Sequence, residues 1–185
     1  DAGDQDVVAV GLHVRDDLQN LLGGFGFAEN HLRHALAQGA VVVDRTVFYP
    51  LGGGQPGDTG SMSWPTGSAR FVDTRYGDSG EILHFVEEGG PLPAVGETVH
   101  LELDWDRRYR HMRMHTAMHL LGAVLRYGVT GGNISAEKSR LDLDMEDSVD
   151  KDSVSTAMQA LVEADHPVSC RWISDAELDA NPELV

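Results

Sequence analysis

Two histidines lie four residues apart in this chain, at His115 and His119, in a stretch rich in arginine and methionine. In a helix, side chains at positions i and i+4 lie one turn apart on the same face, so two imidazoles at this spacing can grip one metal ion. The same pair can also flank a hydrophobic core as ordinary polar residues. A His-x3-His pair alone does not decide between these two interpretations.

The spacing of apolar residues predicts the helix that must position these histidines. At about 100° per residue, five small or apolar side chains fall on one stripe, which is typical of the core-facing side of an amphipathic helix. They are Met114, Ala117, Met118, Leu121 and Leu125. Asp104 or Asp106 can cap the start of this helix, and Gly128 can end it in a left-handed conformation.

Four arginines gather at the start of the predicted helix, at Arg107, Arg108, Arg110 and Arg113. The formal net charge of the chain is −16, which argues against a broad basic surface for nonspecific nucleic-acid binding. A local basic cluster is therefore the best candidate for contacts with phosphates. In the alternative interpretation, the arginine stems pack around the helix start and pair with Asp104 and Asp106.

A glycine-rich stretch occupies residues 50–60 and reads Pro-Leu-Gly-Gly-Gly-Gln-Pro-Gly-Asp-Thr-Gly. It follows a strand predicted over residues 38–49. Three consecutive glycines suit a place where the chain turns sharply or where another group approaches the backbone closely. No Gly-Lys-Ser/Thr sequence follows, which excludes a phosphate-gripping P-loop. The residues alone leave two interpretations, a tight β-turn or a substrate-binding loop.

The rest of the chain predicts two further structural regions. Short strands over 61–64, 69–73, 82–86 and 98–103, separated by turns rich in Gly, Pro and Asp, predict a small antiparallel barrel or curled sheet. After Asp104 the pattern predicts the His helix, a strand over 139–145, a helix over 148–164, a strand over 167–173 and a helix over 175–179. This order indicates a two-layer α/β domain.

The N-terminal residues, 1–37, form a segment of unclear structure. A strand over 7–14, a short helix over 17–22 and a bend over 23–27 are expected there. The predicted domains are thus 1–37, 38–104 and 105–185. A single cysteine, Cys170, and the lack of a long apolar run favour a cytoplasmic, reducing compartment.

Two separate stretches together resemble one known family. The first stretch spans residues 44–60 and reads Asp-Arg-Thr-Val-Phe-Tyr-Pro-Leu-Gly-Gly-Gly-Gln-Pro-Gly-Asp-Thr-Gly. The second spans residues 104–121 and reads Asp-Trp-Asp-Arg-Arg-Tyr-Arg-His-Met-Arg-Met-His-Thr-Ala-Met-His-Leu-Leu. They are similar to the editing domain of alanyl-tRNA synthetase and to its free-standing relatives, the AlaX-type alanyl-tRNA editing proteins. Thr-Gly-Gly-Asn-Ile-Ser at residues 130–135 fits the same pattern.

The resemblance implies an α+β fold, in which a small antiparallel β-barrel with a glycine-rich loop packs on a two-layer α/β editing domain of the alanyl/threonyl-tRNA synthetase type. It implies hydrolysis of Ser-tRNA(Ala) or Gly-tRNA(Ala), with tRNA as partner and zinc as cofactor. His115 and His119 would be the zinc ligands and, with Gln55, the catalytic residues. Substrate would meet Gly52, Gly53, Gly54 and Thr130, and the arginine cluster would meet tRNA phosphates.

One departure from the family's pattern keeps other functions open. The family completes its zinc site with a Cys-x3-His motif, and this sequence ends before such a motif. Cys170 is followed four residues later by Ser174, and is expected to be a small core residue. His166 is expected in a surface turn, and His111 is the nearest substitute ligand. The alternatives are a non-catalytic tRNA-binding module and an editing fragment of a full alanyl-tRNA synthetase.

Overall fold

The computed structural model describes residues 7–11, 30–35, 39–146, 148–167 and 169–181. The chain divides into two compact units, which we describe separately. One unit comprises residues 26–148, and the other combines residues 1–25 with residues 149–185. The predicted helix over 17–22 and bend over 23–27 lie outside the described residues. None of the described helices combines the length and apolar character needed to span a membrane.

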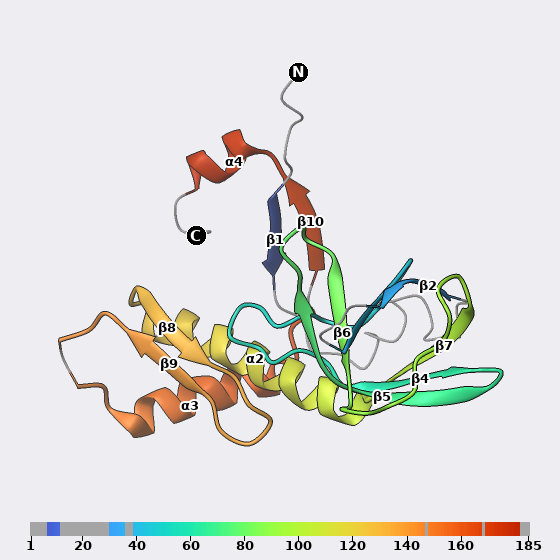
Figure 1. Cartoon of the computed structure of the whole chain (residues 1–185). Helices are drawn as coiled ribbons and strands as arrows, with labels where there is room; N and C mark the ends of the chain where they lie inside the picture. The colour runs from blue at the N-terminus through green and yellow to red at the C-terminus, as the bar shows by residue number, and fades with distance from the viewer. Residues whose placement is uncertain (1–6, 12–29, 36–38, 147, 168, 182–185) are drawn as a thin grey trace. The chain divides into compact units, whose positions relative to one another are not determined.

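A closed antiparallel barrel forms the larger part of the 26–148 unit (Figure 1). The strands follow one another round the barrel in the order β2-β3-β6-β5-β4-β7. Their bounds are Asn30–Ala35 for β2, Ala40–Val43 for β3, Gly60–Trp64 for β4, Gly67–Tyr76 for β5, Ile82–Val86 for β6 and Thr98–Leu103 for β7. The strands predicted over 61–64, 69–73, 82–86 and 98–103 are confirmed, and along β7 apolar and polar residues alternate with a period of two.

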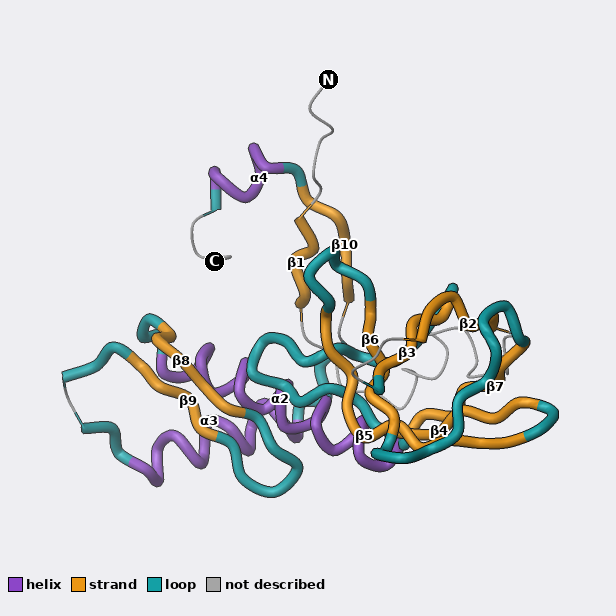
Figure 2. The backbone as a smooth tube through the Cα atoms, viewed as in Figure 1, coloured by secondary structure: helices purple, strands orange, loops and turns teal. Residues whose placement is uncertain are grey.

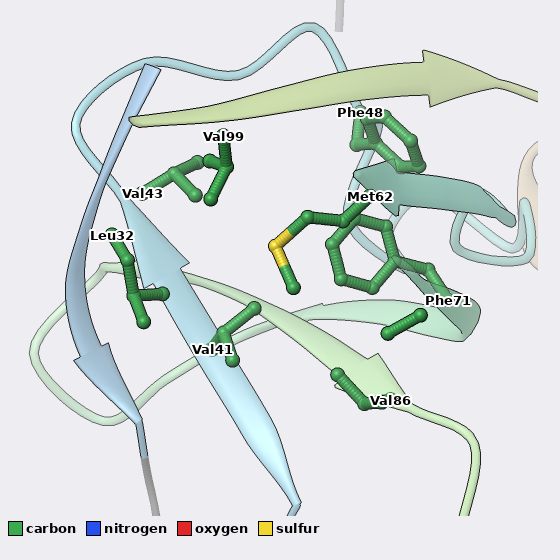
Figure 3. Close-up of a cluster of buried hydrophobic side chains, with 9 residues drawn as sticks. Leu32, Val41, Val43, Phe48, Met62, Phe71, Val86 and Val99 are labelled. Carbon is green, nitrogen blue, oxygen red and sulfur yellow. The ribbon is translucent and has the colours of Figure 1, made fainter. Parts of the chain in front are cut away.

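Side chains from all six strands meet inside the barrel (Figure 3). The cluster comprises Leu32, Val41, Val43, Phe48, Met62, Ala69, Phe71, Val86 and Val99. Phe48 comes from the loop after β3, and its ring meets that of Phe71 edge to face with 5.4 Å between centroids. Burying a side chain of this size stabilises a fold by roughly 1.5–3 kcal/mol. Phe48 therefore ties the start of the glycine-rich stretch to the barrel interior.

The strand predicted over residues 38–49 is wrong in its extent, because β3 ends at Val43. Beyond it, the Thr46 hydroxyl accepts a hydrogen bond from the Phe48 N–H at 3.0 Å and contacts His84 Nε2 at 2.8 Å. Such a local side-chain bond competes with a ladder of strand hydrogen bonds. The β-branched run therefore leaves the sheet and turns Phe48 inward.

His84 is fully buried between the barrel strands and the loop, and burial lowers its pKa from 6.5 to about 4. The folded protein thus keeps this imidazole neutral, whereas the unfolded chain takes up a proton below pH 6.5. The stability from the neutral form is complete above that pH and is lost as the pH falls toward 4. We expect about 2 kcal/mol less stability at pH 5 than at pH 7 from this residue alone. Denaturant titrations of the protein and of His84→Gln at pH 5 and pH 7 measure this difference in the free energy of unfolding. The same pH dependence in both proteins would contradict the prediction.

A long helix and a two-stranded sheet complete the 26–148 unit. The helix α2 spans Trp105–Leu125, and β8 (Val129–Asn133) pairs antiparallel with β9 (Arg140–Leu143). Asp104 caps α2 by accepting from the Arg107 N–H at 3.2 Å, as predicted. At the other end the left-handed residue is Arg126, with φ 55°, and not Gly128.

The buried side of α2 differs from the prediction. The five residues of the apolar stripe are each half-buried, whereas Arg108 and His111 are the buried ones. The helix therefore turns its arginine and histidine side toward the barrel, and its apolar stripe lies on a neighbouring face. A hydrogen bond from Arg107 to the Gly57 carbonyl joins α2 to the segment before β4, and α2 belongs to the 26–148 unit.

The described residues of the second unit form one antiparallel strand pair and two helices. Strand β1 (Val7–Gly11) pairs with β10 (Ser169–Ile173), with Val7 opposite Ile173. Helix α3 spans Lys151–Glu163 and is capped by Asp150, and α4 spans Asp175–Ala180 and is capped by Ser174. The strands predicted over 7–14 and 167–173 and the helices predicted over 148–164 and 175–179 are confirmed in type, whereas nothing in the sequence predicted the partner of β1.

Candidate active site

The two histidines of the His-x3-His pair lie side by side on α2. The rings of His115 and His119 stack with 5.0 Å between centroids and 15° between planes. Burial, and to a lesser extent the neighbouring His119, lowers the pKa of His115. His115 is therefore favoured as the neutral imidazole, which is the form that binds metals and accepts protons.

Gln55 of the glycine-rich loop contacts His115 directly. Its Oε1 lies 2.9 Å from His115 Nδ1, and the Gln55 residue is only 3% exposed. The sequence places these residues sixty positions apart, and the fold brings them together. Gln55 thus meets the edge of the imidazole from inside the protein.

The glycine-rich loop makes a tight turn beside His115, drawn in teal between β3 and β4 in Figure 2. Gly52 and Gln55 exchange backbone hydrogen bonds of 3.2 and 2.9 Å, and Gly53 and Gly54 adopt φ values of 54° and 76° between them. A Cβ on Gly53 would lie 3.6 Å from His115 Cε1, and one on Gly54 would lie 3.4 Å from the Gly132 oxygen. The left-handed φ values therefore favour glycine at both positions, whereas a Cβ there would make only ordinary contacts with α2 and β8.

A buried ion pair fastens the loop to the helix. Arg108 Nε and Nη2 lie 3.2 and 3.0 Å from the two carboxylate oxygens of Asp58, and Nη2 also donates to the Val47 carbonyl at 2.9 Å. The Tyr49 N–H donates to Asp58 at 2.6 Å, and the Tyr49 hydroxyl donates to the Gly52 carbonyl at 3.0 Å. We call Tyr49, Asp58 and Arg108 the loop anchor, because they connect the turn to the barrel and to α2.

The arginine cluster predicted to contact phosphates divides into two groups. Arg108 is 8% exposed and held by Asp58, which favours the packing interpretation for this residue, although its partner is neither Asp104 nor Asp106. Arg107 Nη1 donates to the Gly57 carbonyl at 2.8 Å. Arg110 and Arg113 are exposed, and at 3.6 residues per turn they lie roughly 140° and 160° round the helix from His115.

Strand β8 brings Thr130 into the same unit. The register shifts between Val129 and Gly131, so Thr130 is the extra residue of a β-bulge and is exposed. Bulges re-aim side chains and recur next to active sites. The Ile134 N–H donates to the Gly54 carbonyl at 3.0 Å, which joins the end of this strand to the loop.

The described residues contain no cluster of three or more His, Cys, Asp or Glu that could hold a metal ion. His111 is 4% exposed and its Nδ1 has no hydrogen-bond partner among the described residues. Cys170 belongs to β10 and His166 is exposed after α3, both in the other unit. His115 and His119 thus offer two imidazoles for a metal.

Comparisons with known proteins give this geometry its context. The family described as "tRNA synthetases class II (A)" matches residues 19–107. The chain is 43% identical over 111 residues to alanyl-tRNA editing protein AlaX-M of Saccharolobus solfataricus, covering 57% of this chain and 47% of that protein. It is 36% identical over 151 residues to AlaX-M of Methanosarcina acetivorans, covering 75% and 61%. The chain is a relative of the AlaX-type alanyl-tRNA editing proteins.

The AlaX relationship also extends to larger enzymes. The chain is 48% identical over 81 residues to alanine--tRNA ligase of Pyrobaculum arsenaticum, covering 44% of this chain and 9% of the ligase. The chain spans about half the length of the first AlaX-M relatives it matches. The resemblance identified from the glycine-rich loop and the His helix is therefore confirmed at the level of the family.

Sequence reasoning missed the loop anchor in this AlaX relative. Asp58 stands in the quoted Gly-Asp-Thr-Gly motif, yet its spacing of fifty residues from Arg108 gives no sign of a pair. An aspartate inside a glycine-rich turn after an aromatic strand was the available signal. Carboxylates in such turns usually bind backbone N–H groups, as Asp58 binds that of Tyr49.

Proposed function

We propose that this chain carries the editing site of a hydrolase that deacylates mischarged Ser-tRNA(Ala) or Gly-tRNA(Ala). The observation that supports this most is the contact of Gln55, from the glycine-rich loop, with His115 of the His-x3-His helix. The two motifs that the sequence shares with AlaX proteins thus meet at one place. The names of the relatives, alanyl-tRNA editing proteins, support the same reaction. Its substrate is proposed to be a cytoplasmic tRNA.

We also propose zinc as the cofactor, with His115 and His119 as two of its ligands. The donor set suits zinc in type, because both groups are imidazoles and His115 is favoured in its neutral form. The described residues supply too few ligands, because structural zinc sites have four protein ligands and catalytic zinc sites usually have three. When bound, zinc would supply Lewis-acid chemistry.

The chain's own residues suggest how the ester would be held. The Gly52 N–H already donates to the Gln55 carbonyl, so the exposed Gly53 and Gly54 are the better candidates to donate to an oxyanion. Thr130, on the bulge of β8, is proposed to contact the serine hydroxyl. The proposal includes a two-layer α/β editing domain around α2, β8 and β9, of the alanyl/threonyl-tRNA synthetase type.

The direct test is hydrolysis of purified Ser-tRNA(Ala), with Ala-tRNA(Ala) as the matched control. We expect release of serine above the rate without protein, and little release of alanine. Equal rates with and without the protein, after zinc has been supplied, would refute the hydrolase. Binding of the tRNA without hydrolysis would instead support the non-catalytic module, and a dependence on added ligase domains would support the synthetase fragment.

The exposed arginines provide a test of tRNA as the partner. Reversing the charge of Arg110 and Arg113 to glutamate should weaken tRNA binding steeply at low salt and little at high salt, because phosphate contacts release counterions. The slope of log affinity against log salt should fall by about one to two. Arg75→Glu, on the barrel strand β5, is the control. An unchanged slope would place Arg110 and Arg113 outside the tRNA interface.

A further inference from the structure

We infer that Gln55 is a positioning residue, which holds the proton of His115 on Nδ1 and leaves the Nε2 lone pair available to a ligand. This inference deepens the proposed function and rests on it for its biological meaning. It assigns to Gln55 a role through His115, whereas the resemblance to AlaX proteins implied that Gln55 is itself a catalytic residue.

The backbone around Gln55 gives its side chain a defined direction. The paired hydrogen bonds between Gly52 and Gln55 close the turn, and the Gly54 carbonyl is held by the Ile134 N–H at 3.0 Å. The loop anchor fixes the following residues through Asp58 and Arg108. The turn fixes where the Gln55 side chain leaves the backbone, and because the residue is only 3% exposed, packing limits its rotamers, so its contact with His115 is pre-organised.

The chemistry of the contact selects one tautomer. A neutral imidazole carries its proton on one nitrogen and a lone pair on the other. The amide Oε1 faces the ring and accepts, so in this arrangement the nitrogen 2.9 Å away, Nδ1, donates; an amide turned the other way would present its NH2 group and reverse the tautomer. The lone pair then belongs to Nε2, the ring nitrogen that Gln55 does not contact. Metal-binding histidines are commonly oriented in this way by a second acceptor.

The burial of Gln55 separates positioning from direct contact with substrate. At 3% exposure, the residue can present very little surface to a bound tRNA. Gly53 and Gly54, which precede it, are exposed and lie at the same turn. A Cβ added at Gly53 would lie 3.6 Å from His115 Cε1, so the turn itself covers one edge of the ring. The loop therefore serves the site in two ways, with its glycines outward and its glutamine inward.

The test uses long-range ¹H–¹⁵N NMR of the histidine side chains, with Gln55→Leu and Gln55→Glu compared with the unaltered protein. In the unaltered protein we expect His115 in the Nδ1–H tautomer. Gln55→Leu should convert it to a mixture of tautomers, and Gln55→Glu should restore the Nδ1–H form because a carboxylate also accepts. Zinc affinity, measured by chelator competition, should fall about ten- to a hundredfold in Gln55→Leu and much less in Gln55→Glu.

Thr46→Val is the matched control, because it removes the hydroxyl that contacts His84 and leaves His115 untouched. An Nε2–H tautomer in the unaltered protein would overturn the inference, and so would Gln55→Leu with unchanged tautomer and zinc affinity. Because the tautomer is read without zinc or substrate, it also separates the two proposals. The expected spectra with no hydrolysis would leave the inference standing and remove the editing function.

Discussion

His115→Ala and His119→Ala should each reduce hydrolysis of Ser-tRNA(Ala) by roughly a hundredfold or more, while the protein stays folded. Both side chains contribute a nitrogen to the proposed zinc site, and neither belongs to the hydrophobic cluster of the barrel. Removing either imidazole leaves the proposed zinc site with only one of its two histidine ligands. The rates of serine release by the two variants and by the unaltered protein give the effect directly.

His166→Ala is the matched control for these variants, because His166 is an exposed histidine in the other unit. Circular dichroism should show the same helix content in all four proteins. Zinc analysis after dialysis should show that the two variants retain less metal than the unaltered protein. Near-normal hydrolysis by either His115→Ala or His119→Ala would remove both residues from the site.

Asp58→Ala should destabilise the 26–148 unit by about 3–5 kcal/mol, because it leaves the buried guanidinium of Arg108 without its counter-charge. It also takes the acceptor from the Tyr49 N–H. The cost is large for one residue, since whole domains are stable by only about 5–15 kcal/mol. Denaturant titration of the variant measures the loss.

Asp142→Ala provides the comparison for Asp58→Ala. Asp142 forms an exposed ion pair with Arg140 on β9, so its removal should change stability by less than about 1 kcal/mol. The double variant Asp58→Leu, Arg108→Met should recover much of the lost stability, because no charge is then left buried. Equal effects of Asp58→Ala and Asp142→Ala would show that the loop anchor contributes little.

The sequence predicted local structure best where one periodic pattern dominated. The strand at 98–103 and the start of α2 after Asp104 follow from alternation and capping, which depend on near neighbours. The strand over 38–49 was too long, because the β-branched run gave no hint that Thr46 would bond to Phe48 and His84. Local propensity yields to such tertiary contacts.

The site itself was only partly predictable. The histidine pair, the glycine-rich loop and Gln55 were identified as candidates, but the contact between Gln55 and His115 joins residues sixty positions apart. The apolar stripe of α2 suggested which side faces the core, yet Arg108 and His111 are the buried residues. A buried arginine depends on a partner such as Asp58, and no spacing rule connects a loop carboxylate with a helix fifty residues later.

The pairing of β1 with β10 has a consequence for how the chain is made. Val7 emerges from the ribosome roughly 170 residues before its partner Ile173, so at 5–20 residues per second it waits about ten to thirty seconds. The whole 26–148 unit, with the barrel, the glycine-rich loop and α2, is synthesised in that interval. Contacts so distant in sequence form late, because closing a long loop costs entropy first. The part of the chain that carries the histidines therefore has the opportunity to fold during translation while β1 is still unpaired.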